Sequence, residues 1–179
     1  MINMPNILAL ENEVREEELE ALEAYRKGLA EAPMLYKVSG YSIDDKAAEL
    51  DIDSMIFVAS EESPDRVGDV ITAEGWELAN FRRNPIVLLS HDHHTLPLGT
   101  VSKVWIEADA KQLLARVKWD MADERAATVA GKYQRKVMRA VSVGFRPIEF
   151  KDRDGKERGI HFLKQELLEL SAVSVPMHP

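Results

Sequence analysis

The sequence RAVSVGFRP at residues 139–147 shares its AVSV string with LSAVSVPMHP at residues 170–179. Side chains alternate between the two faces of a β-strand. In the first copy this alternation places Val141, Val143 and Phe145 on one face, which we expect to pack into a core. The stretch therefore indicates a fold built on a sheet.

The opposite face of the first copy consists of small residues around one hydroxyl. Ser142 and Gly144 share this face, and Arg146 follows at its end. Another backbone could approach Ser142 closely there, as a peptide must when a hydroxyl attacks it. Gly144 leaves room for N–H groups that bind an oxyanion, and Arg146 is either a substrate contact or an ordinary surface arginine. In the second copy, Pro176 removes a ladder donor, which predicts that Ser174 lies at a strand end.

Composition limits the function. The chain has 179 residues with 45% hydrophobic residues, which is enough for one domain with a core. Its 23 basic and 31 acidic residues give a net charge of -8, so we do not expect nucleic acid as a direct partner. The absence of cysteine removes disulfides, thiolate zinc sites and a cysteine nucleophile. We see no apolar run long enough for a membrane span.

The N-terminal segment is strongly acidic. Residues 11–31 contain eight acidic and three basic residues, with Leu19, Leu22, Tyr25 and Leu29 at helical spacing. The pattern predicts an amphipathic helix with a thin apolar stripe. We expect residues 1–33 to form an acidic helical arm, either loosely held or docked on an assembly partner.

The main domain is expected over residues 34–179, where short β-type runs alternate with turn residues. One interior helix is predicted, acidic at its start and basic at its end, and no glycine-rich phosphate loop occurs. The pattern predicts a β-rich α+β domain. The expected strands cover residues 34–43, 51–60, 84–90, 99–107, 111–120, 140–147 and the later part of 160–175, with a turn at 152–159 and the helix within 122–140.

A serine nucleophile needs a base, and histidines cluster in LLSHDHHTLPLG. His91 directly follows an apolar run, which predicts a firmly held position at a strand end. His93 and His94 fall in a polar loop and should be exposed. One alternative is that all three are ordinary residues of a surface loop, and another is that they form a metal site around Asp92. The metal pattern lacks a helical i, i+4 pair and a second cluster.

The ordered segments resemble those of the prohead proteases of tailed phages, the capsid-maturation serine endopeptidases related in fold to herpesvirus assemblins. The matching segments are DRVGDVI, NPIVLLSHD, PLGTV, AVSVGF and LLELSAVSVP, which together span roughly residues 50–178. The His91-to-Ser142 interval of 51 residues (142 minus 91) also fits. Family members generally continue past the final VP segment, whereas this sequence stops at Pro179.

The resemblance implies an α+β fold with an assemblin-like β-barrel core surrounded by helices. It also implies roles for individual residues, with Ser142 as the nucleophile and His91 as the general base. A carboxylate near the last core strand would orient the base, which carries over to Glu169. Glu166, Asp92 and His161 remain alternatives for that third position. No cofactor or metal is implied.

The implied function is a serine endopeptidase of prohead maturation. Its expected substrates are scaffold segments, the major capsid protein and the protease itself, inside the immature capsid in the host cytoplasm. A homo-oligomer is a further expectation. Two alternatives belong to other classes: a non-catalytic capsid or scaffold assembly module with the same fold, and a metal-dependent hydrolase that uses the His91–His94 cluster.

Overall fold

The structure, a computed structural model, describes residues 7–40, 53–153 and 159–174. These residues form two α-helices, nine strands and two short 3-10 helices. In chain order the elements are α1 (Ile7–Arg26), β1 (Leu35–Gly40), β2 (Ser54–Glu61), β3 (Val70–Ile71), η2 (Ala73–Gly75), β4 (Trp76–Glu77), η3 (Phe81–Arg83), β5 (Ile86–Leu89), β6 (Gly99–Glu107), β7 (Gln112–Trp119), α2 (Glu124–Gln134), β8 (Ala140–Asp152) and β9 (Ile160–Val173).

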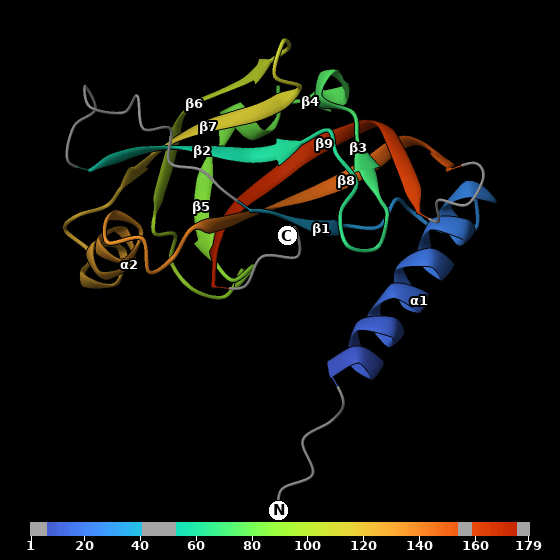
Figure 1. The fold of residues 1–179 in the computed structure, drawn as a ribbon, viewed down its shortest axis with the longest axis horizontal. Helices are drawn as coiled ribbons and strands as arrows, with labels where there is room; N and C mark the ends of the chain where they lie inside the picture. The colour runs from blue at the N-terminus through green and yellow to red at the C-terminus, as the bar shows by residue number, and fades with distance from the viewer. Residues whose placement is uncertain (1–6, 41–52, 154–158, 175–179) are drawn as a thin grey trace, which may run out of the picture.

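The long antiparallel pair β8 and β9 organises the sheet (Figure 1). The strand order is β1-β8-β9-β5-β6-β7-β2, so β8 lies between β1 and β9. The other edge of β9 pairs in turn with β3, β4 and β5, all parallel to it. The strand that carries the first AVSV string and the strand in which the second one begins are therefore neighbours at the centre of the fold.

The core face predicted for the first AVSV string is confirmed. Val141, Val143 and Phe145 are all buried. The Phe145 ring meets Trp76 and Phe162 edge-on, with centroids 5.7 and 5.2 Å away. The alternation predicted for residues 111–120 is confirmed as well, because Leu113, Ala115, Val117 and Trp119 of β7 are buried. These side chains all belong to the hydrophobic core.

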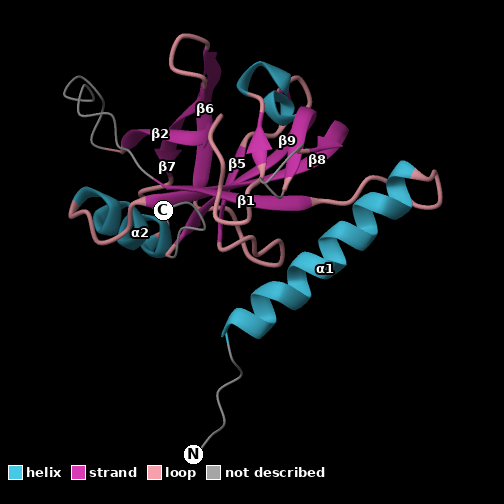
Figure 2. Cartoon of the chain, turned by 45° about the vertical axis from the view of Figure 1, so that its right-hand side comes forward, coloured by secondary structure: helices cyan, strands magenta, loops and turns pink. Residues whose placement is uncertain are grey.

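The sheet curls into a half-barrel, and bulges contribute to its curvature. The pairing of β8 with β9 shifts at Gly144/Phe145 and at two further points, and the pairs β6–β7 and β2–β7 each shift once. The predicted ring of helices is wrong for the described residues. Those residues contain two α-helices, which lie at opposite ends of the sheet (Figure 2). Residues 70–84 form the short strands β3 and β4 and the single turns η2 and η3 instead.

The interior helix is shorter than the predicted range, because local signals end it. The carboxylate of Asp123 caps its start by accepting a 2.8 Å hydrogen bond from the Arg125 N–H. Lys136 has a left-handed φ of 59°, which ends the helical path. Glu124 and Lys132 give the expected charges at the two ends. None of the helices in the described residues is long and apolar enough to cross a membrane.

The acidic N-terminal segment forms α1, which contacts the sheet through a buried charge network. The Arg15 guanidinium donates to both oxygens of Asp69, at 2.9 and 2.6 Å. The Lys37 ammonium of β1 lies 2.6 Å from Asp69 and 2.9 Å from Asp65. Asp69 also accepts a 2.7 Å hydrogen bond from the Ile160 N–H. Burial lowers the pKa of Lys37, but the two carboxylates outweigh it and raise that pKa.

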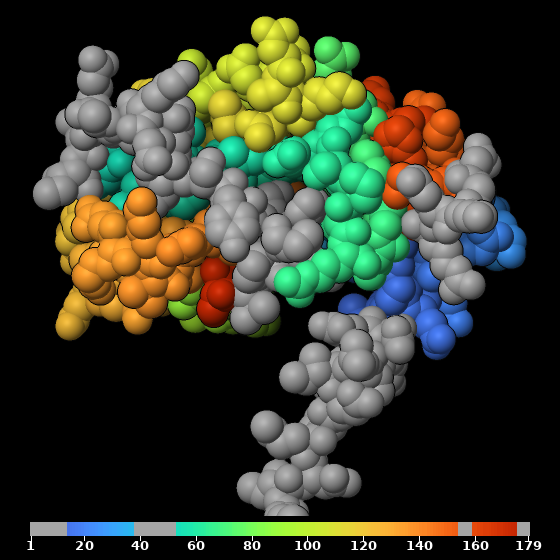
Figure 3. All heavy atoms as spheres, in the orientation of Figure 1, coloured from blue at the N-terminus to red at the C-terminus, as the bar shows by residue number. Residues whose placement is uncertain are grey.

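The network gives part of the DRVGDVI segment a structural role, because Asp65 and Asp69 of this segment supply both carboxylates. Leu22 of α1 is buried, and Figure 3 shows α1 in blue against the green segment that contains Asp69. The expected boundary at residue 33 stays a prediction. Pro176 and the centre of the predicted turn, residues 154–158, lie outside the described residues.

Replacement of Asp69 should destabilise the fold strongly. Asp69→Asn removes a buried anion and leaves Arg15 and Lys37 without their shared partner, which should cost about 3–5 kcal/mol of unfolding free energy. Asp152→Asn is the matched control, because Asp152 pairs with Arg26 on the surface. The control should lose less than about 1 kcal/mol in urea unfolding. Equal losses in both variants would contradict a structural role for the network.

Candidate active site

His91 lies in a tight turn directly after β5, as the apolar run before it predicted. The Asp92 N–H donates to the Leu89 carbonyl, and the two residues between them have positive φ values, 51° for Ser90 and 60° for His91. Neither is glycine, so the left-handed conformation is unfavourable and has to be held by tertiary contacts. One such contact is the 2.9 Å hydrogen bond from the Ser90 N–H to the Ala172 carbonyl of β9.

The His91 imidazole contacts the carboxylate of Glu169. Its Nδ1 forms a hydrogen bond with Oε1 of that residue. Glu169 belongs to β9 and its side chain is 2% exposed, so this carboxylate depends on protein partners. The β9 bulge next to Glu169 leaves Leu168 as an extra residue in the pairing. Bulges of this kind change the direction in which neighbouring side chains point.

The same imidazole reaches across β8 to β1. Tyr36 of β1 packs on His91 with ring centroids 4.2 Å apart. Tyr36, Gly144 and Glu169 are register neighbours on three adjacent strands. The imidazole therefore bridges Glu169 of β9 and Tyr36 of β1, while the space that a Gly144 side chain would fill is taken by Glu169 and Met34. Burial and then the negative charge of Glu169 raise the pKa of Tyr36, which keeps its phenol neutral.

Ser142 shares this face of β8, two residues from Gly144 or about 6.6 Å along the strand. Its side chain is fully buried, and its hydroxyl donates a 3.2 Å hydrogen bond to the Lys37 carbonyl. The sequence predicted a face that another backbone could approach. In the structure the backbone that approaches Ser142 is the chain's own β1. Ser174, by contrast, is exposed beyond the end of β9.

The three alternatives to Glu169 have other partners. Glu166 accepts hydrogen bonds from Asn80 and Arg146, which lower its pKa. Asp92 accepts a 2.8 Å hydrogen bond from the main chain of His94. His161 lies 2.9 Å from the Thr72 hydroxyl. In the contacts of the described residues, Glu169 is the carboxylate that meets the His91 ring.

Arg146 and Gly144 lie on the same face as Ser142. The Arg146 guanidinium forms an ion pair with Glu166, and its side chain is about half exposed. A substrate contact by Arg146 and an oxyanion role for Gly144 both stay predictions. The structure gives Gly144 a steric role. A Cβ there would lie 2.6 Å from the Glu169 Cγ and 2.8 Å from the Met34 Cε.

The histidine cluster is divided between two environments. His93 and His94 are exposed as predicted. His93 nevertheless reaches Glu169, with 3.7 Å between Nε2 and Oε2. Across the described residues, no three histidine or carboxylate side chains are arranged to hold a metal ion.

Sequence reasoning missed Tyr36 and Ser171. The Ser171 hydroxyl accepts a 3.2 Å hydrogen bond from the His91 N–H and lies 3.3 Å from Oε1 of Glu169. Its position two residues after Glu169 could have indicated a shared face. Tyr36 carries no comparable local signal, because its contact with His91 depends on the pairing of β1 with β8.

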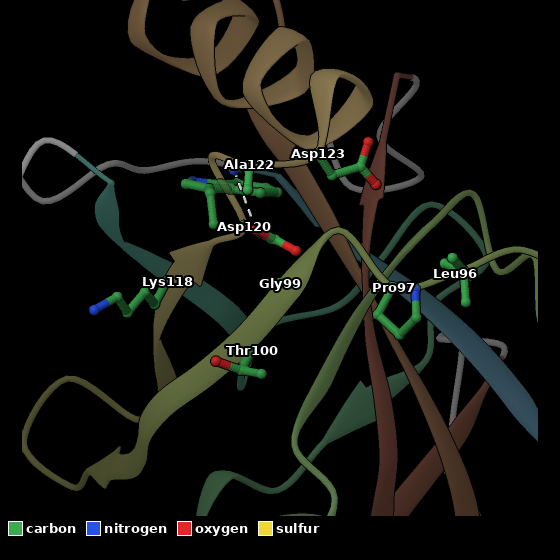
Figure 4. Close-up of a pocket in the computed structure, with 9 residues that line it drawn as sticks. Leu96, Pro97, Gly99, Thr100, Lys118, Asp120, Ala122 and Asp123 are labelled. Carbon is green, nitrogen blue, oxygen red and sulfur yellow. Dashed lines mark hydrogen bonds between the residues drawn. The ribbon is translucent and has the colours of Figure 1, made fainter.

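A separate hollow of about 760 Å³ lies where the loop after His91 approaches the start of α2 (Figure 4). Ser142, His91 and Glu169 are not among its lining residues. Its walls are Leu96, Pro97, Gly99, Thr100, Lys118, Trp119, Asp120, Ala122 and Asp123. The histidine and carboxylate therefore meet outside this hollow.

Comparison with known proteins decides the family. The sequence model for the caudovirus prohead serine proteases matches residues 43–179. The chain belongs to this family. Family membership makes it a protease of phage capsid maturation. The matched residues include His91, Ser142 and Glu169, whereas α1 and β1 lie before the match.

Individual relatives agree with the family. The prohead protease of Escherichia phage T5 is 29% identical over 153 residues, which cover 83% of this chain and 69% of that protein. A capsid polyprotein of Pseudomonas phage PAJU2 is 30% identical over 127 residues, 66% of this chain but 18% of the polyprotein. The capsid assembly protease of bacteriophage T4 has a similar fold, with a TM-score of 0.60 and 12% identity over 82% of this chain and all of that chain.

Substitution of Gly144 should displace the Glu169 carboxylate. The added methyl group of Gly144→Ala overlaps Glu169 and Met34, and a misplacement of about 1 Å in an active site can cost about 100-fold in rate. We expect a loss of that size in proteolysis by a folded protein. Gly131→Ala is the control, because this glycine of α2 faces only the flexible end of the Arg135 side chain. Wild-type proteolysis by Gly144→Ala would contradict the steric role.

Proposed function

We propose that the chain is a serine endopeptidase in which Ser142 is the nucleophile, His91 the general base and Glu169 the residue that orients the base. One observation carries the proposal: the His91 imidazole contacts Glu169 of β9 and Tyr36 of β1, both of which pair with Gly144, two residues from Ser142 on the same face of β8. The serine class implied by the family description also supports it.

The contact with Glu169 selects the useful tautomer of His91. An ionised carboxylate only accepts hydrogen bonds, so neutral His91 carries its proton on Nδ1 and keeps Nε2 as an acceptor. During attack on a scissile carbonyl, Nε2 takes the hydroxyl proton of Ser142. The resulting imidazolium is stabilised by Glu169 and then protonates the leaving amine. Water then attacks the acyl group on Ser142 while His91 takes a proton from the water. His91 returns this proton to the Ser142 oxygen as the ester bond breaks and the acid product leaves.

The structure corresponds to a resting arrangement of this machinery. The Ser142 hydroxyl donates to the Lys37 carbonyl and is fully buried. Transfer of its proton to His91 therefore requires rotation of the serine side chain, and substrate entry requires movement of covering groups. An enzyme that waits for an assembled shell would need restraint of this kind.

The proposed substrates are the major capsid protein, scaffold segments and the chain itself, inside the immature capsid in the host cytoplasm. The T5 relative is named a prohead protease, and the PAJU2 relative a capsid polyprotein, which supports substrates from the capsid. A fold relationship to herpesvirus assemblins is part of the proposal and is supported by the curled sheet. A homo-oligomer and a docking role for residues 1–33 are further proposals.

Replacement of the serine tests the function. Co-expression with the capsid protein of the same phage should give processed capsid protein for the wild type and for Ser174→Ala, by intact mass. Ser142→Ala should leave it intact, because loss of a serine nucleophile removes roughly 10⁶-fold in rate. Processing by Ser142→Ala would disprove the mechanism, and an unprocessed product in every case would favour the assembly module. Loss of processing on addition of a chelator would favour the metal hydrolase.

A further inference from the structure

We propose that Ser171 is a positioning residue that fixes the main chain of His91 and the carboxylate of Glu169 relative to each other. The inference rests on the proposed function, because it concerns the base and its orienting group. Ser171 itself would not touch the substrate.

A single hydroxyl serves both partners. The Ser171 Oγ lies 3.3 and 3.4 Å from the two oxygens of Glu169 and accepts a 3.2 Å hydrogen bond from the His91 N–H. A serine hydroxyl has one proton to donate and two lone pairs that accept. It can therefore donate to the carboxylate and accept from the main chain at the same time. Ser171 is fully buried, so no bulk water competes for either bond.

The strained turn explains why His91 needs this contact. Ser90 and His91 both have positive φ values, a left-handed conformation that is unfavourable for residues other than glycine. Two hydrogen bonds join their N–H groups to β9, one to the Ala172 carbonyl and one to the Ser171 hydroxyl. The second is the one that a side-chain substitution removes. Its loss should allow the imidazole to leave its contacts with Glu169 and Tyr36.

The register also separates the roles of two buried serines. Ser171 is the direct partner of Ser142 in the β8–β9 pair, so the two hydroxyls belong to one face. The Ser171 proton is directed to Glu169, whereas Ser142 donates to the Lys37 carbonyl. Ser142 is free to exchange that neutral acceptor for a base, while Ser171 is bonded to the group that orients the base.

The test measures the rate at which a fluorophosphonate reagent phosphonylates Ser142, with loss of fluoride, at saturating and at limiting concentrations of the reagent. Ser171→Ala should lower the limiting rate about 100-fold with an unchanged half-saturation concentration, because the base is displaced while the binding surface remains. Ser171→Cys keeps the size of the side chain but is a weak donor and acceptor, so it should behave like the alanine variant. Ser171→Thr keeps the hydroxyl and should recover at least a tenth of the wild-type rate.

A second measurement is independent of catalysis. Magnetic resonance should show a nuclear Overhauser contact between the rings of His91 and Tyr36 in the wild type, and this contact should disappear in Ser171→Ala. A purely structural role predicts lower thermal stability with both the contact and the limiting rate retained, which would overturn the proposal. Wild-type protein that shows the ring contact but no phosphonylation of Ser142 would count against the proposed function, not against the position of Ser171.

Discussion

The register of β1, β8 and β9 is the constraint on which the site depends. It places Tyr36, Gly144 and Glu169 side by side on three strands, and the His91 imidazole contacts the outer two. A one-residue slip of β9 against β8 would turn Glu169 to the opposite face. The same slip would expose Leu170, which is 1% exposed, so core packing and the position of the carboxylate enforce the same register.

A buried carboxylate and a strained turn are both unfavourable taken alone. Glu169 loses hydration, and the turn at His91 holds two non-glycine residues at positive φ. Their contacts compensate each other, because the His91 ring and the Ser171 hydroxyl both lie within hydrogen-bonding distance of the carboxylate. The same hydroxyl accepts the His91 N–H. The strain is therefore local to the proposed chemistry, and the surrounding strands stabilise it.

Sequence reasoning succeeded where information is local. The alternation in residues 140–147 predicted the core face, and the apolar run before His91 predicted its firm position. Sequence patterns could not predict the contact of Tyr36 with the His91 ring or that of the Lys37 carbonyl with the Ser142 hydroxyl. Both contacts depend on the pairing of β1 with β8, which lies about 100 residues further along the chain. The predicted ring of helices was wrong, since residues 70–84 add the short strands β3 and β4 to the edge of β9. The role of Asp69 could not be predicted either, because the two cationic side chains that pair with it, Arg15 and Lys37, are distant from it in the sequence.

The most direct test of the account is to identify the residue that a fluorophosphonate reagent modifies, by mass spectrometry of peptides from the labelled protein. The account predicts an adduct on Ser142, absent from Ser171 and Ser174, and its loss in His91→Ala. An adduct on another serine, or full labelling of Ser142 without His91, would contradict the arrangement of nucleophile and base described above.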